Sequence, residues 1–173
     1  MRLYMLIVPV MLLAASADAA TVYETRDAFI QRAFSGSPPK PSMIWLKDKQ
    51  KSRVQKILGH AYPALRLRYW CRANRSAWIL EEIGKELPIT IGTIIDDGQI
   101  KSLRVLIYRE NRGGEVSTPA FTDQFDGVAL AENDTLDAHI DGISGATLSV
   151  QALNRLARVA LFLHTDSTCA DDL

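Results

Sequence analysis

Hydrophobic and polar positions alternate with a period of two through the middle of the chain. In residues 65–72 the odd positions are Leu, Leu, Tyr and Cys, whereas the even positions are three arginines and Trp70, which predicts a half-buried strand. Residues 89–95 and 100–108 predict two further strands, and the Asp-Asp-Gly-Gln sequence at residues 96–99 is typical of a hairpin turn between them. Residues 77–82 are compatible with a returning strand or with a short helix, and the pattern leaves both open.

Helical periodicity occurs at both ends of the chain. Five apolar side chains of residues 148–163 fall on one stripe and predict an amphipathic helix. Residues 21–24 have the spacing of a capping box and predict the start of a helix that a Gly- and Pro-rich segment ends. Residues 47–58 predict another helix. Strands in the middle with helices at both ends predict one α+β domain over residues 20–173, a mainly antiparallel sheet with helices packed on it.

The first residues have the pattern of a secretory signal peptide. Arg2 precedes an apolar run over residues 3–15, and small residues follow at positions 16–20. The run is shorter than the ~20 residues that span a bilayer. We therefore expect residues 1–19 to be a cleaved signal peptide, with no membrane span afterwards and a periplasmic location.

Composition and charge narrow the class of protein. A chain of 173 residues with 47% hydrophobic content can bury the core of one domain. Lys+Arg and Asp+Glu both number 20, so the chain has no excess of positive charge that would attract nucleic acid. We therefore expect no nucleic-acid partner.

The cysteines and histidines indicate no metal site. A disulfide between Cys71 and Cys169 is compatible with an oxidising compartment, but the sequence does not show that they lie close together. His60, His139 and His164 are scattered without ligand spacing, so we predict no metal.

The segment with the clearest chemistry is Asp-Gly-Ile-Ser-Gly-Ala-Thr-Leu-Ser at residues 141–149. A turn of small residues here leads directly into the predicted C-terminal helix. Unpaired N–H groups and the helix dipole suit a phosphate at that point. The alternative is an ordinary N-cap in which Ser144 or Thr147 accepts a backbone N–H.

This segment resembles the flavinylation motif of the FMN-binding domain family, which includes FMN subunits of the sodium-pumping NADH:quinone reductase and the Rnf complex. The resemblance implies that Thr147 carries FMN through a phosphoester, attached by an FAD-dependent flavin transferase. The other positions that match the motif are Asp141, Ser144, Gly145, Ala146 and Ser149. Of these, Asp141 and Ser144 are expected to help in recognition or in holding the phosphate.

A second segment, Tyr-Arg-Glu-Asn-Arg-Gly-Gly-Glu-Val at residues 108–116, resembles the loop of stand-alone family members. A flavin ring needs hydrogen-bond partners along its edge and an apolar face to lie on. The candidate ring contacts in this loop are Glu110, Arg112, Gly113, Gly114 and Glu115. Phe121 or Phe125 is a candidate to cover one face of the ring.

These features predict an exported electron-transfer flavoprotein that receives electrons from a membrane redox partner. We expect a carrier rather than a free-standing enzyme, because the sequence has neither a nucleotide-binding Gly-x-Gly-x-x-Gly after a strand nor a catalytic triad pattern. Two alternatives remain open: a terminal reductase in which a small acceptor meets the flavin, and a binding module without redox chemistry.

Overall fold

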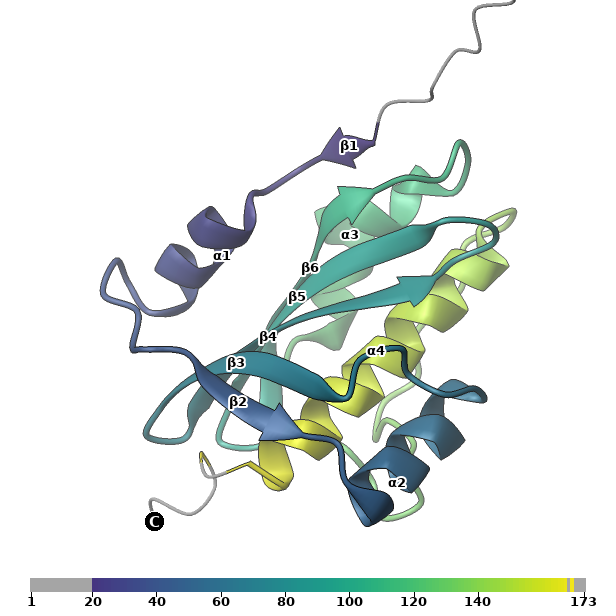
Figure 1. The fold of residues 1–173 in the computed structure, drawn as a ribbon. Coiled ribbons are helices and arrows are strands. Elements are labelled where there is room, and N and C mark those ends of the chain that lie inside the picture. The colour runs from purple at the N-terminus through teal and green to yellow at the C-terminus, as the bar shows by residue number, and fades with distance from the viewer. Residues whose placement is uncertain (1–19, 168, 170–173) are drawn as a thin grey trace, which may run out of the picture.

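The computed structural model describes residues 20–167 and 169. Its sheet is mainly an antiparallel meander, in which five strands that follow one another in the sequence are also neighbours in space (Figure 1). The sheet has the order β1-β6-β5-β4-β3-β2. A short strand β1 pairs with the outer edge of β6. The strands are β1 (Thr21–Val22), β2 (Ser42–Trp45), β3 (Arg66–Arg72), β4 (Arg75–Ile83), β5 (Pro88–Asp96) and β6 (Gln99–Tyr108).

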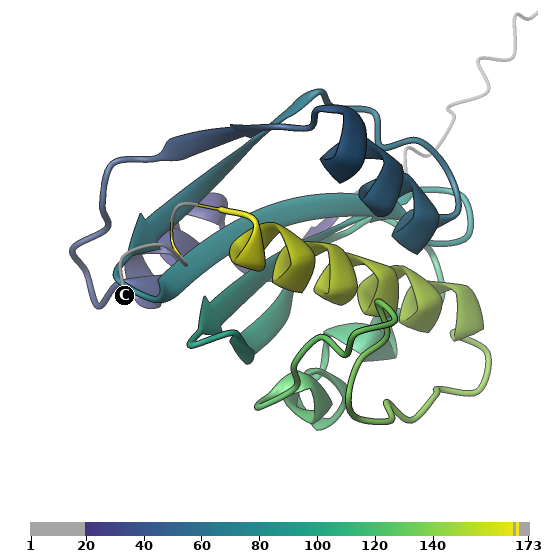
Figure 2. The ribbon, with the colours of Figure 1, turned by 90° about the horizontal axis from the view of Figure 1, so that it is seen from below.

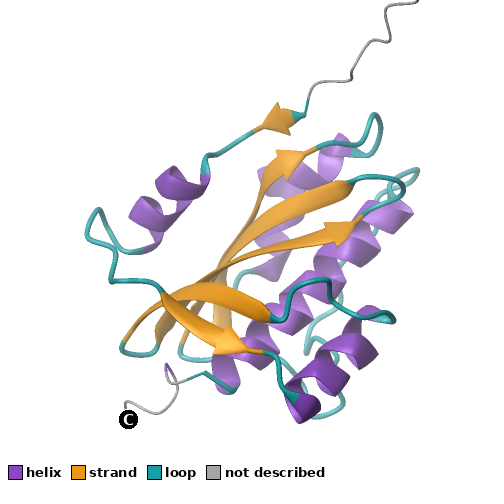
Figure 3. Ribbon diagram, in the orientation of Figure 1, coloured by secondary structure: helices purple, strands orange, loops and turns teal. Residues whose placement is uncertain are grey.

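The helices cover both faces of the sheet, as Figure 3 shows with helices in purple and strands in orange. The long helix α4 (Thr147–Thr165) crosses one face and contacts β4, β5 and β6, and α2 (Asp48–Leu58) packs beside it. The short helix α1 (Arg26–Ala33) lies on the opposite face (Figure 2). Between β6 and α4 lie α3 (Pro119–Thr122) and two 3-10 helices, η1 (Gly114–Ser117) and η2 (Asp123–Phe125).

The main core lies between the sheet and α4. The alternation in β3 directs Leu67 and Tyr69 into this core and leaves the arginines of the strand exposed. Tyr69 stacks on the fully buried Trp78 of β4, with ring centroids 4.7 Å apart. Burial of such rings is a large favourable contribution to folding, so this pair joins β3 to β4 within the main core.

The structure confirms the predicted α+β class. It also shows the conformation of residues 77–82, for which the sequence left both strand and helix open. Residues 77–82 belong to strand β4, paired with β3 on one side and β5 on the other. The expected capping box at residues 21–24 is wrong. Residues 21 and 22 form β1, and the N-cap is Thr25, whose Oγ1 accepts a hydrogen bond from the Ala28 N–H at 3.2 Å.

A disulfide joins the end of the chain to the sheet. Cys71 of β3 and Cys169 are bonded, with Cα atoms 5.7 Å apart. The predicted signal peptide, residues 1–19, lies outside the described residues. Across the described part of the chain, no helix combines the length and the apolar character that a membrane span needs.

Candidate functional site

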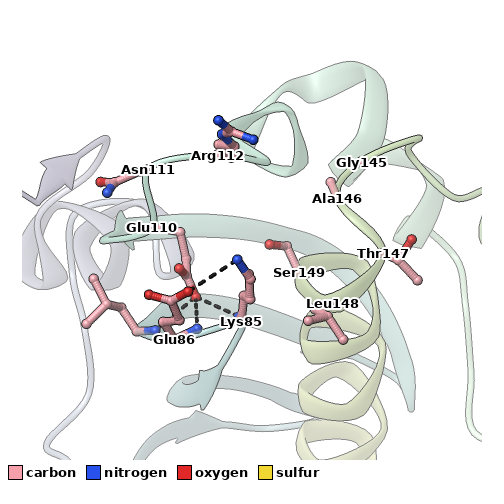
Figure 4. Close-up of a pocket in the computed structure, with 11 residues that line it drawn as sticks. Lys85, Glu86, Glu110, Asn111, Arg112, Gly145, Ala146, Thr147, Leu148 and Ser149 are labelled. Atoms are coloured by element: carbon pink, nitrogen blue, oxygen red, sulfur yellow. Dashed lines mark hydrogen bonds and ion pairs between the residues drawn. The ribbon is translucent and has the colours of Figure 1, made fainter.

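A cavity of about 450 Å³ opens at the N-terminal end of α4. Its walls come from three places in the sequence: the β4–β5 turn (residues 84–87), the chain after β6, and the first turn of α4 (Figure 4). The residues that line it are Lys85, Glu86, Leu87, Glu110, Asn111, Arg112, Gly145, Ala146, Thr147, Leu148 and Ser149. The fold therefore brings the two sequence segments of interest to one site.

The turn that precedes α4 leaves the N-terminus of the helix without a side-chain cap. Gly145 adopts a left-handed conformation, with φ 82°, and Ala146 is the N-cap residue, with no side-chain hydrogen bond at the cap. The ordinary N-cap role considered for Ser144 or Thr147 is therefore not what the structure shows. The N–H groups of the first helical turn have no intrahelical partners, and they favour an anion at this end of the helix.

Thr147 is exposed at the first position of α4. Figure 4 shows its side chain projecting from the helix on the side away from Glu110 and Lys85. The hydroxyl is thus accessible to a modifying enzyme, and it lies beside the unpaired N–H groups of the same turn.

A buried hydrogen-bond pair joins β6 to α4. The Oη of Tyr108 lies 3.0 Å from the Oγ of Ser149, and it also donates to the backbone carbonyl of Arg112. Burial raises the pKa of the Tyr108 phenol, so the group stays protonated and able to donate. Ser149, the last residue of the motif, thus joins the loop after β6 to the helix, and it also lines the cavity.

The same contact explains Gly113, which has φ 81°. A Cβ atom built on Gly113 would lie 3.0 Å from the Tyr108 Oη and 3.2 Å from the Cβ of Ala146. Only glycine permits both this conformation and this approach. Gly113 therefore holds the loop against the residues that precede Thr147.

Glu110, a predicted contact of the flavin ring, lines the cavity and binds the backbone of the β4–β5 turn. Its Oε1 accepts hydrogen bonds from the backbone N–H groups of Lys85, Glu86 and Leu87, at 2.6, 2.7 and 2.9 Å. Burial acts to raise the pKa of the carboxyl, but these three donors and the charge of Lys85 outweigh it and lower the pKa below its usual value. Glu110 is thus a carboxylate that fixes the β4–β5 turn.

The remaining predicted residues lie beside the cavity rather than on its walls. Asp141 and Ser144 are exposed in the turn before α4, and the backbone N–H of Asp141 donates to the Oε1 of Gln124 at 2.7 Å. Gly114 and Glu115 belong to η1. None of these four residues lines the cavity in the described part of the chain.

Phe121 and Phe125 do not cover a ring in the cavity, contrary to the sequence-based expectation. Both are buried in the main core, where they pack edge to face with centroids 5.9 Å apart. The short elements α3 and η2, which contain the two residues, pack against β6, and the gain from burying apolar surface favours a core position over a solvated cavity.

The β4–β5 turn is the part of the site that the sequence analysis missed. Lys85, Glu86 and Leu87 line the cavity although they lie far from the motif in sequence. The only local signal is Gly84 and Pro88, which bracket a turn between two strands. That signal predicts a turn and says nothing about its neighbours.

Comparison with known proteins identifies the region that contains this site. Residues 84–161, slightly less than half of the chain, match the model of the FMN-binding domain family. No curated protein and no solved structure matches the chain. Within the described residues, no group of three or more His, Cys, Asp or Glu side chains is placed to hold a metal ion.

Proposed function

We propose that the protein, whose residues 84–161 match the model of the FMN-binding domain family, is an exported electron carrier with FMN bound covalently to Thr147. The bound FMN supplies a ring that accepts and gives up one or two electrons. The observation that carries the proposal is the uncapped N-terminus of α4, which stands next to an exposed Thr147 hydroxyl and opens onto a cavity.

The residues of the site suit each part of the cofactor. The free N–H groups of the first turn of α4 favour the charge that a phosphodiester keeps. Gly145 and Ala146 leave the Thr147 hydroxyl accessible to a transferase. The cavity beside them is lined by both polar and apolar groups, including Arg112 and Leu148, which is the combination that a flavin ring needs.

Attachment uses the hydroxyl of Thr147 and a Mg²⁺-dependent transferase with its FAD. The Oγ of Thr147 forms a bond to the phosphorus of the FMN half of FAD. The anhydride bond to the other half breaks and AMP leaves, while the hydroxyl proton passes to a base of the transferase. The protein gains the mass of FMN less one water.

Export agrees with two features of the chain. The pattern of residues 1–19 is that of a signal peptide, and a disulfide such as Cys71–Cys169 persists in oxidising compartments. A covalent bond prevents loss of FMN in the periplasm, and a membrane redox protein is the natural source of electrons there.

The test is co-expression with an FAD-dependent flavin transferase, followed by intact-mass measurement. We expect the wild type and Thr147→Ser to gain FMN, and Thr147→Ala to gain nothing. Thr165→Ala is the matched control, because Thr165 is an exposed threonine at the other end of the same helix. An unmodified wild type in the presence of active transferase would contradict covalent attachment.

A further inference from the structure

The β4–β5 turn forms the wall of the cavity that faces the first turn of α4. Lys85 and Ser149 both line this cavity, and Figure 4 shows the side chain of Lys85 extended from the turn with its amine joined to Glu86 by a dashed line. A positive charge is therefore placed within the same space that Thr147, Ala146 and Ser149 border.

This turn is fixed in place although it is exposed. One carboxylate oxygen of Glu110 accepts the N–H groups of three successive residues, Lys85 to Leu87. A Cβ atom on Gly84 would lie 3.0 Å from that same oxygen and 2.9 Å from the Cδ1 of Ile89. The backbone from which Lys85 projects is thus held by three charge-assisted hydrogen bonds.

The ion pair that the Lys85 amine forms is a weak one. Its Nζ lies 3.2 Å from the Oε1 of Glu86, but these side chains are 70% and 71% exposed. Ion pairs so open to water are weak. The Oε1 of Glu110 is already occupied by the three N–H groups of the turn. The charge of Lys85 is therefore available to a group bound in the cavity.

We propose that Lys85 sets the reduction potential of the bound FMN by stabilising the negative charge of its reduced form. This inference rests on the proposed function. Two electrons from a donor and one proton from water convert the neutral oxidised ring into a reduced ring with one negative charge. A cation in the cavity stabilises the charged ring more than the neutral one, so it raises the potential. Glu110 is the positioning residue for Lys85.

The experiment measures the reduction potential of the flavinylated protein by titration with dithionite against reference dyes. We expect Lys85→Gln to weaken the preference for the reduced form about tenfold, which lowers a two-electron potential by about 30 mV. The matched control is Lys101→Gln, which also removes one positive charge. Lys101 is an exposed residue of β6 whose Nζ lies 3.7 Å from Asp126 and outside the cavity.

Three further measurements separate a charge effect from a structural one. Glu86→Gln removes the anion beside Lys85, so we expect the potential to rise. Loss of Lys85 also makes the reduced ring bind its second proton more readily. A plot of the reduction potential against pH changes slope at the pKa of that second proton. We therefore expect the change of slope to occur at a higher pH in Lys85→Gln. In a Glu110→Ala background, Lys85→Gln should shift the potential less than it does in the wild type.

Equal potentials in Lys85→Gln and wild type, with FMN attached to both, would overturn the proposal and leave the proposed function intact. Equal shifts in Lys85→Gln and Lys101→Gln would overturn it as well, because a long-range charge effect would then suffice. A wild type that carries no FMN by intact mass would overturn both proposals, so the two failures are distinguishable.

Discussion

The phenol oxygen of Tyr108 lies 3.0 Å from the hydroxyl oxygen of Ser149, and the two residues are 41 positions apart in the chain. Tyr108 ends β6, and Ser149 is in the first turn of α4. This pair closes the loop that contains the candidate ring contacts onto the helix that contains Thr147.

We expect Tyr108→Phe to lower the free energy of unfolding by about 1–2 kcal/mol. The substitution removes the donor to the Arg112 carbonyl and leaves the buried Ser149 hydroxyl without this partner. Urea unfolding of the apo protein measures the change. Tyr23→Phe is the control, because Tyr23 is half exposed, and it should shift the midpoint little. Equal effects of the two substitutions would contradict the role of the Tyr108 hydroxyl.

Gly113→Ala should destabilise the protein more than Gly127→Ala. Both glycines have left-handed φ values, 81° and 79°, so both substitutions carry a conformational cost of roughly 1–2 kcal/mol. A Cβ on Gly127 meets nothing within 4 Å, whereas one on Gly113 meets the Tyr108 hydroxyl and Ala146. We expect an additional loss of roughly 1 kcal/mol or more at Gly113, measured by urea unfolding. Similar losses would show that the close approach has no energetic weight.

Reduction of the disulfide should weaken the fold without removing the site. Cys71 and Cys169 close a loop of 98 positions, and loss of such a link costs about 2–5 kcal/mol through the greater freedom of the unfolded chain. Thermal unfolding with and without dithiothreitol measures this effect. The double variant Cys71→Ala/Cys169→Ala should be equally destabilised and should not respond to the reductant. An identical melting temperature in both redox states would contradict the expectation.

Asp134 should make stability depend on acid pH. Its buried carboxylate accepts from the Nε of Arg53 at 2.7 Å and pairs with Lys56 at 3.3 Å. Burial acts to raise the pKa of Asp134, but these two partners lower it below its usual value overall. Because the folded-state pKa is depressed, the contribution is present above the unfolded value of about 3.9. It is lost as the pH falls through the lower folded-state pKa.

The variant Asp134→Asn tests this dependence. It should be less stable than the wild type at neutral pH, and the difference should shrink as the pH falls below 4, on the scale of the ordinary carboxyl pKa of about 3.9. The exposed pair of Asp126 with Lys101 provides the control: Asp126→Asn should change stability little at any pH. A constant difference between wild type and Asp134→Asn across the pH range would contradict the assignment.

Local patterns were sufficient for most of the fold. The alternation of residues 65–72 and the stripe of residues 148–163 depend only on spacing along the chain, and β3 and α4 agree with them. The segment at residues 77–82 was undecided because its apolar residues suit both periods. Pairing with β3 and β5 decided it, since a central strand gains hydrogen bonds on both edges.

The sequence by itself determined that Thr147 stands at a helix N-terminus after a turn of small residues, because that arrangement is local. Only the tertiary structure decided which other groups line the cavity at that end of the helix. Lys85 and Glu110 reach the site from the β4–β5 turn and the loop after β6, and Phe121 is withdrawn into the core. Such contacts depend on strand order and on the burial of apolar surface across the whole domain, which no spacing along the chain encodes.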